Sequence, residues 1–209
     1  MVFIFLWLAQ RAPRHMMKGW LGWAALWGVA GGAAHVAFRR HPHRTKLVRT
    51  SVSLAHCLAW WWLPQPPLLG AAVYYAGDLL HMLWFGQHWP SMLAHHGMAL
   101  LLLRHAGGLA PLSPMRRTIE QLFWLAEMSN LPGALVYGSL KLRGRSHPLT
   151  QKLLGVQMVT YTWYRTVRIS EVLVHSPWLR SVPCYLLPCW LVWPMGLWWS
   201  AKLCADIMR

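Results

Sequence analysis

The sequence predicts an all-α protein, a polytopic bundle of about seven transmembrane helices. Of its 209 residues 56% are hydrophobic and only 12% are charged, whereas soluble domains carry about 25% charged residues. Several apolar runs reach the roughly 20 residues that a helix needs to cross a bilayer. The Lys and Arg residues, which give a formal net charge of +15, gather in the connections between these runs. There they set topology and contact anionic lipid.

Residues 1–18 are expected to form an N-terminal segment separate from a single transmembrane domain over residues 19–209. The segment begins with an apolar run, MVFIFLWLA, which as a helix would span only about 14 Å. Its first basic residues, Arg11 and Arg14, follow this run, and that order is wrong for a secretory signal. We therefore expect an interfacial or half-inserted helix.

The first three expected spans are 19–38, 50–63 and 68–85. The first contains Gly28 and Gly32, a spacing that lets another helix approach closely. The second ends in three tryptophans, which favour the membrane interface. Three prolines within residues 64–67 predict a turn before the third span, because proline fixes φ and removes a donor.

Four further spans are expected at 91–103, 118–140, 151–175 and 182–204. Pro90 suits the start of the first of these helices. The span 91–103 is followed by a stretch containing Gly, Pro and Ser, and the span 118–140 is followed by a basic connection over residues 141–150. With alternating sides, more Lys and Arg residues fall on the C-terminal side, which places the C-terminus in the cytoplasm or the mitochondrial matrix.

The chain has only five acidic residues, and three of them lie in apolar segments between Tyr74 and Pro132. Ionisable groups at membrane depth are costly and usually face the protein interior, so they indicate function. Asp78 and His81 are three residues apart and share a helix face. The pair His95–His96 lies in the next expected span, which an antiparallel arrangement would bring alongside Asp78.

Two further groups repeat helical spacing. Glu120 and Glu127 are seven residues apart and share a face, with Asn130 nearby, while Arg168 and Glu171 can pair within one helix. The polar residues expected to line an internal cavity are therefore Asp78, His81, Glu120, Glu127, Asn130, Arg168 and Glu171.

Three interpretations of these polar residues remain open. They can be hydrogen-bonding groups that fix helix register, a proton- or acyl-transfer centre with His95 or His96 as base, or a metal site. No metal is expected, because the chain has no HExxH motif and no series of histidine boxes. The first basic connection is expected to bind phospholipid headgroups through Arg39, Arg40, Arg44, Lys46 and Arg49.

Several stretches together resemble the TLC domain, a lipid-handling membrane family that includes ceramide synthases and translocation-associated membrane proteins. YYAGDLLHMLWF followed by MLAHHGMALLLL resembles the family's aspartate-bearing helix and its paired histidines. FWLAEMSNLPGALVY resembles its acidic stretch, and WYRTVRISEVL followed by PCWLVWPMGLWWSAKLCADIMR resembles its last two helices. The resemblance implies a multispan bundle around a lipid-accessible cavity. It also implies an acyl-transfer role for His95 and His96 in a synthase.

The pattern departs from the ceramide synthases. HHGMA stands where a Thr is expected after the pair, and Glu120 and Glu127 replace an aspartate pair. The resemblance therefore favours the smaller non-synthase members, with a role in lipid sensing, trafficking or homeostasis in the endoplasmic reticulum or another endomembrane. The mitochondrial inner membrane is the alternative location.

Two other functions stay open. One is an acyl-CoA-dependent lipid acyltransferase, with acyl-CoA as substrate. The other is an accessory subunit of a large membrane complex, held by partner subunits and anionic lipid at its basic connections. No cofactor and no nucleic-acid partner are expected, because the chain has no basic soluble module.

Overall fold

The computed structural model describes residues 14–63, 68–86, 90–110, 112–177, 193–202 and 205, with the backbone alone at 14–18 and 20. These residues are helical apart from their connections, which confirms the all-α class. The helices are α2 (Arg14–Ala37), α3 (Arg44–Trp62), α4 (Leu68–Trp84), α5 (Pro90–Gly108), α6 (Pro114–Arg143), α7 (Pro148–Tyr161), a π-helical segment η1 (Thr162–Arg168) and α8 (Ile169–His175).

The expected boundaries differ from the structure at both ends of the chain. Helix α2 begins at Arg14, inside the segment expected to be separate, and residues 1–13 lie outside the described residues. Residues 193–202 are helical. The rest of the last expected span is not among the described residues, and neither is the proline-rich turn at 64–67.

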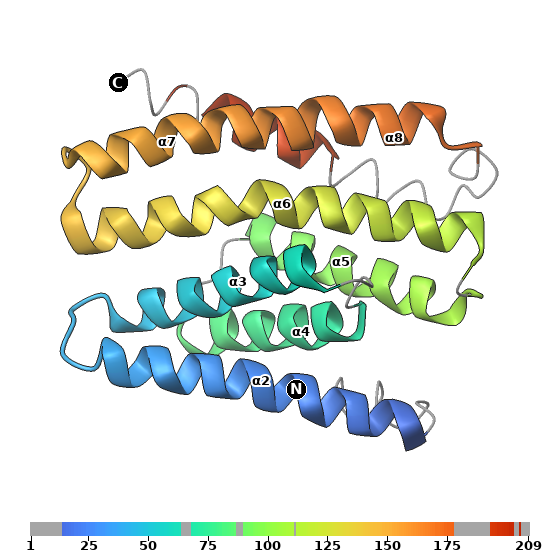
Figure 1. Cartoon of the computed structure of the whole chain (residues 1–209), viewed down its shortest axis with the longest axis horizontal. Coiled ribbons are helices and arrows are strands. Elements are labelled where there is room, and N and C mark those ends of the chain that lie inside the picture. The colour runs from blue at the N-terminus through green and yellow to red at the C-terminus, as the bar shows by residue number, and fades with distance from the viewer. Residues whose placement is uncertain are drawn as a thin grey trace.

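Helix α6 is the central element of the bundle. It lies between α3 and α7 (Figure 1) and packs against both, as well as against α5 and α8. Ser113 caps its start by accepting the Arg116 N–H at 3.3 Å, with Pro114 in the first turn. It ends at Gly144, whose φ of +84° is a conformation that favours glycine. Its 30 residues extend about 45 Å, so that this one helix can pack against α3, α5, α7 and α8 along its length.

Helix α7 lies antiparallel to α6 and is held there by buried hydroxyls. Ser139 and Thr150, one on each helix, lie 2.7 Å apart. His147 caps α7 by accepting the Leu149 N–H at 3.2 Å, and Pro148 occupies the first turn. The short connection between the two caps fixes the hairpin.

Helix α2 packs on α4 through tryptophans instead of glycines. The Trp27 indole N–H donates to the Gly70 carbonyl at 3.1 Å. A Cβ on Gly70 would lie 2.7 Å from the ring of Trp23, so this is the position at which α2 and α4 require a glycine. The close helix contact expected at Gly28 and Gly32 is wrong. A Cβ at either would meet none of the described atoms within 4 Å.

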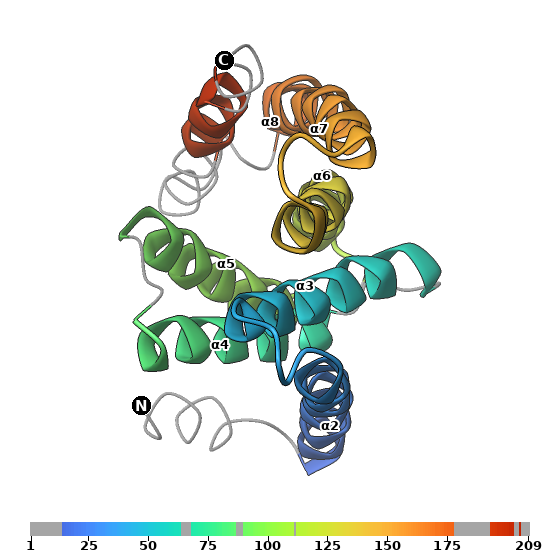
Figure 2. The same cartoon turned by 90° about the vertical axis from the view of Figure 1, so that its left-hand side faces the viewer.

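The two basic connections lie at the same end of the molecule. The connection between α2 and α3 and that between α6 and α7 are both at the left of Figure 1. Figure 2 looks onto this end and shows α2, α6 and α7 running away from the viewer, while α3, α4 and α5 lie at an angle to them. The hydrophobic core is formed by α3, α4, α5, α6 and α8, around Trp60, Tyr75, Phe123, Leu125 and Leu173.

Judged by length and hydropathy together, none of the helices in the described ranges qualifies as a membrane-crossing segment.

Candidate functional site

The interior contains two polar centres, each built around one buried carboxylate. The first is Asp78 on α4, which is 7% exposed. Arg49 of α3 donates to it twice, from Nε to Oδ1 at 2.6 Å and from Nη2 to Oδ2 at 2.8 Å. His96 of α5 places Nε2 2.9 Å from Oδ2. One carboxylate thus joins three helices, and its two oxygens are taken by two basic side chains.

Both ring nitrogens of His96 lie close to oxygens of the protein. Nδ1 is 2.9 Å from the Met92 carbonyl oxygen, and Nε2 is 2.9 Å from Asp78 Oδ2. Neither nitrogen is therefore free to contact a substrate.

The second centre is Glu127 on α6, which is 1% exposed. The Tyr75 hydroxyl donates to Oε1. Oε2 lies 3.5 Å from the Cys57 sulfur and 3.4 Å from the Asn130 amide nitrogen. His56 Nε2 lies 3.4 Å from Oε1, which is longer than a well-formed hydrogen bond. Most donors of this centre are neutral.

Arg165 brings a buried cation beside the Glu127 centre. It lies in η1, is 2% exposed and donates from Nε to Ser129 Oγ at 2.8 Å and from Nη2 to Asn130 Oδ1 at 3.2 Å. Its Nη1 has no partner among the described atoms. The Ile169 N–H bonds to the Tyr164 carbonyl, five residues back, which is the π-helical pattern. Single π turns inside α-helices often occur at functional sites.

His95 is the side chain that connects these centres to an apolar pocket. It is 7% exposed, and its ring lies 5.5 Å from that of Trp199 and 6.4 Å from that of Tyr75. The Nδ1 atom is buried without a partner among the described residues. The pocket is lined by Tyr75, His95, Ala99, Leu102, Leu122, Phe123, Ala126, Ile169, Leu173 and Trp193.

This pocket is small and almost wholly apolar, with a volume of ≈ 50 Å³. Its walls come from α4, α5, α6 and α8 and from Trp193, whose indole donates to Ser170 Oγ at 2.8 Å. A group that enters it would meet the imidazole of His95. The charges of Arg165 and Glu127, which do not line the pocket, both act on this imidazole.

Other residues expected at the cavity lie elsewhere. Glu120 accepts from Arg116 Nε at 2.8 Å on its own helix. Arg168 and Glu171 do pair, but with 40% and 48% of their side chains exposed, because η1 directs Arg165 inward in their place. His81 is half-buried, and its ring lies tilted against that of Phe85 with ring centroids 4.6 Å apart. Of the expected lining residues, Asp78, Glu127 and Asn130 belong to the two centres.

The expected headgroup-binding residues divide into two groups. Arg39, Arg40, Arg44 and Lys46 are exposed at the basic end. Arg49 instead turns inward to Asp78, with 24% of its side chain exposed.

Sequence reasoning missed four residues of the Glu127 centre, namely His56, Cys57, Tyr75 and Arg165. A signal was present for two of them. Tyr75 lies three residues before Asp78 and so shares its helix face, and Arg165 lies three residues before Arg168 beside two tyrosines. His56 and Cys57 gave no signal, since they are single polar residues in an apolar run.

Within the described ranges, no three His, Cys, Asp or Glu side chains are grouped so that they could hold a metal ion. Comparison of the chain with known protein families, curated proteins and solved structures gives no match.

Proposed function

We propose that this chain is a TLC-like integral membrane protein that handles lipid, and that its small apolar pocket takes the polar end of a lipid at His95 with the adjoining carbons of the acyl chain. The pocket carries this proposal. Its lining is almost wholly apolar, and the one ring nitrogen that lacks a partner there, His95 Nδ1, is a group that a lipid carbonyl, hydroxyl or carboxyl would satisfy.

The distribution of apolar and charged residues supports the membrane location. Asp78, Glu127 and Arg165 are buried, as expected for ionisable groups in a protein whose solvent is lipid. Large apolar side chains are exposed on nearly every described helix, where the acyl chains of a bilayer would cover them. Examples are Leu21, Val29, Trp61, Trp62, Trp84, Leu101, Leu135, Val159 and Val174. The location is an endomembrane such as the endoplasmic reticulum, or the mitochondrial inner membrane.

A role in lipid sensing, trafficking or homeostasis fits a pocket that binds without a required chemical step. The motif-bearing residues of the TLC resemblance, Asp78, His95, His96 and Glu127, all lie at or beside this pocket or its two polar centres. The exposed Arg and Lys residues at the basic end would meet anionic headgroups.

The second candidate is acyl transfer from acyl-CoA, and the difference between the two histidines favours His95 as its base. An acceptor hydroxyl or amine would attack the thioester carbonyl, His95 would take its proton, and the CoA thiol would leave. Neither nitrogen of His96 is free for this step, because each lies 2.9 Å from an oxygen of the protein.

The test is to purify the full chain in mild detergent and identify the lipids bound to it by mass spectrometry. Leu102→Phe fills the pocket and is expected to abolish retention of the lipid. Leu101→Phe, on the same helix but 57% exposed, is the matched control and should retain it. Equal retention by both variants, or partner proteins in place of lipid, would overturn the pocket assignment.

The acyl-transfer candidate is tested separately with long-chain acyl-CoA and lipid acceptors. His95→Gln should abolish CoA release, while His96→Gln should retain part of it if the protein still folds. Release of CoA unchanged in a folded His95→Gln variant would exclude His95 as the base.

A further inference from the structure

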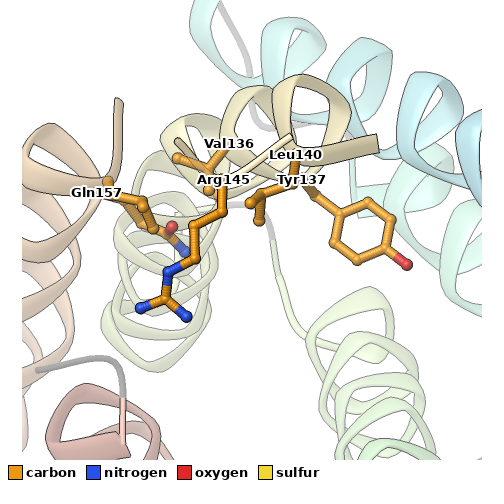
Figure 3. Close-up of a pocket in the computed structure, with 7 residues that line it drawn as sticks. Val136, Tyr137, Leu140, Arg145 and Gln157 are labelled. Carbon is orange, nitrogen blue, oxygen red and sulfur yellow. The ribbon is translucent and has the colours of Figure 1, made fainter. Parts of the chain in front are cut away.

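The His95 pocket differs from a second, larger cavity in the polarity of its walls. The second cavity lies between α6 and α7, has a volume of ≈ 240 Å³ and includes the guanidinium of Arg145 and the amide of Gln157 in its lining (Figure 3). Among the described residues that line the His95 pocket, by contrast, none carries a fixed charge. The walls of the His95 pocket therefore restrict the polar group that a lipid can bring into it.

The size of the pocket limits the polar end. Its volume is ≈ 50 Å³, whereas one water molecule needs about 10–15 Å³, so roughly four non-hydrogen atoms fit inside it. A phosphodiester with its glycerol carbons is larger than this. A hydroxyl, an aldehyde or a carboxylate fits together with the first carbons of an apolar chain. Size alone therefore excludes a phospholipid headgroup.

The two charges near the pocket already balance each other. Arg165 donates from Nη2 to Asn130 Oδ1 at 3.2 Å, and Asn130 Nδ2 donates to Glu127 Oε2 at 3.4 Å, so one amide links the guanidinium to the carboxylate. Neither charged residue lines the pocket. Glu127 is joined to the wall through the hydroxyl of Tyr75, which does line it. Among the described residues, a ligand in the pocket thus meets no cation that lacks a counter-charge.

An ionised end group would therefore remain unpaired in this pocket. A carboxylate there would add a second negative charge beside the Glu127–Arg165 pair, within walls formed mainly by Ala, Leu, Ile and Phe side chains. Taking an ion out of water is costly, and only a partner charge with good geometry offsets the cost. An uncharged end group avoids this cost, so the pocket disfavours an ionised fatty acid.

The ring nitrogen of His95 favours a hydroxyl among the uncharged end groups. His95 Nδ1 is buried and has no hydrogen-bond partner among the described atoms. This nitrogen donates in one tautomer of the imidazole and accepts in the other. A carbonyl satisfies the donor form alone, because it can only accept. A hydroxyl has a donor hydrogen and acceptor lone pairs, so it satisfies His95 in either tautomer.

We propose that the His95 pocket selects long-chain alcohols, lipids whose polar end is a single hydroxyl, over ionised fatty acids and phospholipids. The hydroxyl bonds to His95 Nδ1, and the first carbons lie against Phe123 and Leu102. The rest of the chain leaves the pocket past Leu122 and Trp193, the partly buried residues of its lining. This inference rests on the proposed function, because it names the class of lipid bound at the same site.

The test titrates the full chain in mild detergent with three probes that share one carbon chain, namely oleyl alcohol, oleate and cis-9-octadecene. They are compared at equal mole fraction in the detergent at pH 9, where the carboxyl is ionised, and the retained probe is measured by mass spectrometry after gel filtration. Oleate should bind about a hundredfold more weakly than oleyl alcohol, because its charge is buried without a partner. Oleate bound as tightly as oleyl alcohol would overturn the proposal.

The role of His95 is tested by the preference for oleyl alcohol over octadecene. In the wild type this preference should be about fivefold, the effect of one hydrogen bond, and His95→Leu should remove it. His81→Leu is the matched control, because His81 does not line the pocket, and should keep the preference. A folded His95→Leu variant that still prefers the alcohol would refute the role of His95.

The charge balance is tested with Glu127→Gln. This change leaves Arg165 without its counter-charge, so the ratio of oleate to oleyl alcohol affinity should rise about tenfold, the lower end of what a nearby cation contributes to a carboxylate. Glu120→Gln removes the same charge from a residue that is paired with Arg116 away from the pocket, and should leave the ratio unchanged. Equal ratios in the two variants would overturn the electrostatic argument.

The outcomes separate this inference from the proposed function. If none of the three probes is retained, the pocket does not bind lipid and both fail. If oleate is retained as well as or better than oleyl alcohol, lipid binding at His95 stands and the selection of an uncharged end fails. If octadecene is retained as well as oleyl alcohol by the wild type, the pocket binds apolar chains without recognising a hydroxyl, which also overturns the selection.

Discussion

Asp78 and Glu127 are both carboxylates buried between helices, yet they are satisfied in opposite ways. Asp78 bonds to Arg49 through both oxygens and also to His96. Glu127 bonds to the hydroxyl of Tyr75, with a thiol and an amide nitrogen at longer distances. The first centre is built on the bidentate Arg49 cation, and the second has mainly neutral donors.

This difference indicates that the Asp78 centre stabilises the fold and that the Glu127 centre is the one suited to a ligand. A buried carboxylate with a two-bonded Arg and a second close partner has little capacity left for a ligand, so the Asp78 centre ties α3, α4 and α5 together. The Glu127 centre lies near two groups without partners among the described residues, Arg165 Nη1 and His95 Nδ1. Unused donors and acceptors beside an apolar pocket are what a ligand site requires.

The largest effect is expected from Asp78→Ala. It leaves the Arg49 cation without its counter-charge and His96 Nε2 without its partner, and breaking one side of a buried pair costs about 3–5 kcal/mol. Unfolding in detergent, followed by circular dichroism, measures this loss. The double variant Asp78→Ala with Arg49→Met should be more stable than Asp78→Ala alone. If it is less stable, Arg49 stabilises the fold independently of Asp78.

Arg165→Met should have the next largest effect. It removes hydrogen bonds from a buried cation to Ser129 and Asn130. Because hydrogen bonds to charged groups contribute about 1.5–3 kcal/mol, we expect the free energy of unfolding to fall by about this amount. The same unfolding measurement applies, and lipid retention should also fall, since Arg165 lies beside the pocket. A variant with unchanged stability and retention would place Arg165 outside the functional centre.

Glu127→Gln should cost less, about 1 kcal/mol. The amide keeps an oxygen for the Tyr75 hydroxyl and loses one acceptor for Asn130 and Cys57. Thermal unfolding of Glu127→Gln beside Asp78→Asn provides the comparison. The Asp78 variant should lose more, because Asp78 is paired through both oxygens with the Arg49 cation. Equal losses would mean that the two centres depend on charge to the same extent.

The smallest effect is expected from Arg168→Gln, within about 0.5 kcal/mol, because exposed ion pairs contribute little. Arg168 is the matched control for Arg165, three residues away in the same segment but paired with Glu171 at the surface. A loss of stability comparable to that of Arg165→Met would contradict the assignment of one inward and one outward arginine.

The helical pattern and the segment that holds the centres could be predicted from the sequence. The apolar runs place most helices within a few residues of their ends, and the rarity of acidic residues directs attention to Asp78 and Glu127. Pairing across helices could be predicted for Asp78 and the His95–His96 pair, which the structure brings together through His96, but not for Asp78 and Arg49. Arg49 lies in a basic stretch and resembles the lipid-facing residues around it, and only the packing of α3 against α4 turns it toward Asp78.

The sequence predicts that Arg168 faces the interior, whereas in the structure Arg165 is buried and Arg168 is exposed. In a regular α-helix, residues three apart share a face, so spacing alone cannot distinguish the two arginines. The π-helical segment changes which one points inward. Its hydrogen bonds depend on tertiary packing, and nothing in the pattern TWYRTVR distinguishes it from ordinary helix.

The same segment has a consequence for chain length. A π turn accommodates one residue more than an α turn, so η1 corresponds to a one-residue insertion within a continuous helix. Deleting one residue between 162 and 168 would be absorbed by a return to α geometry and would leave α8 in its orientation relative to α7. Ile169 and Leu173 would then stay in the pocket wall. In a regular α-helix the same deletion would instead rotate everything that follows by about 100°.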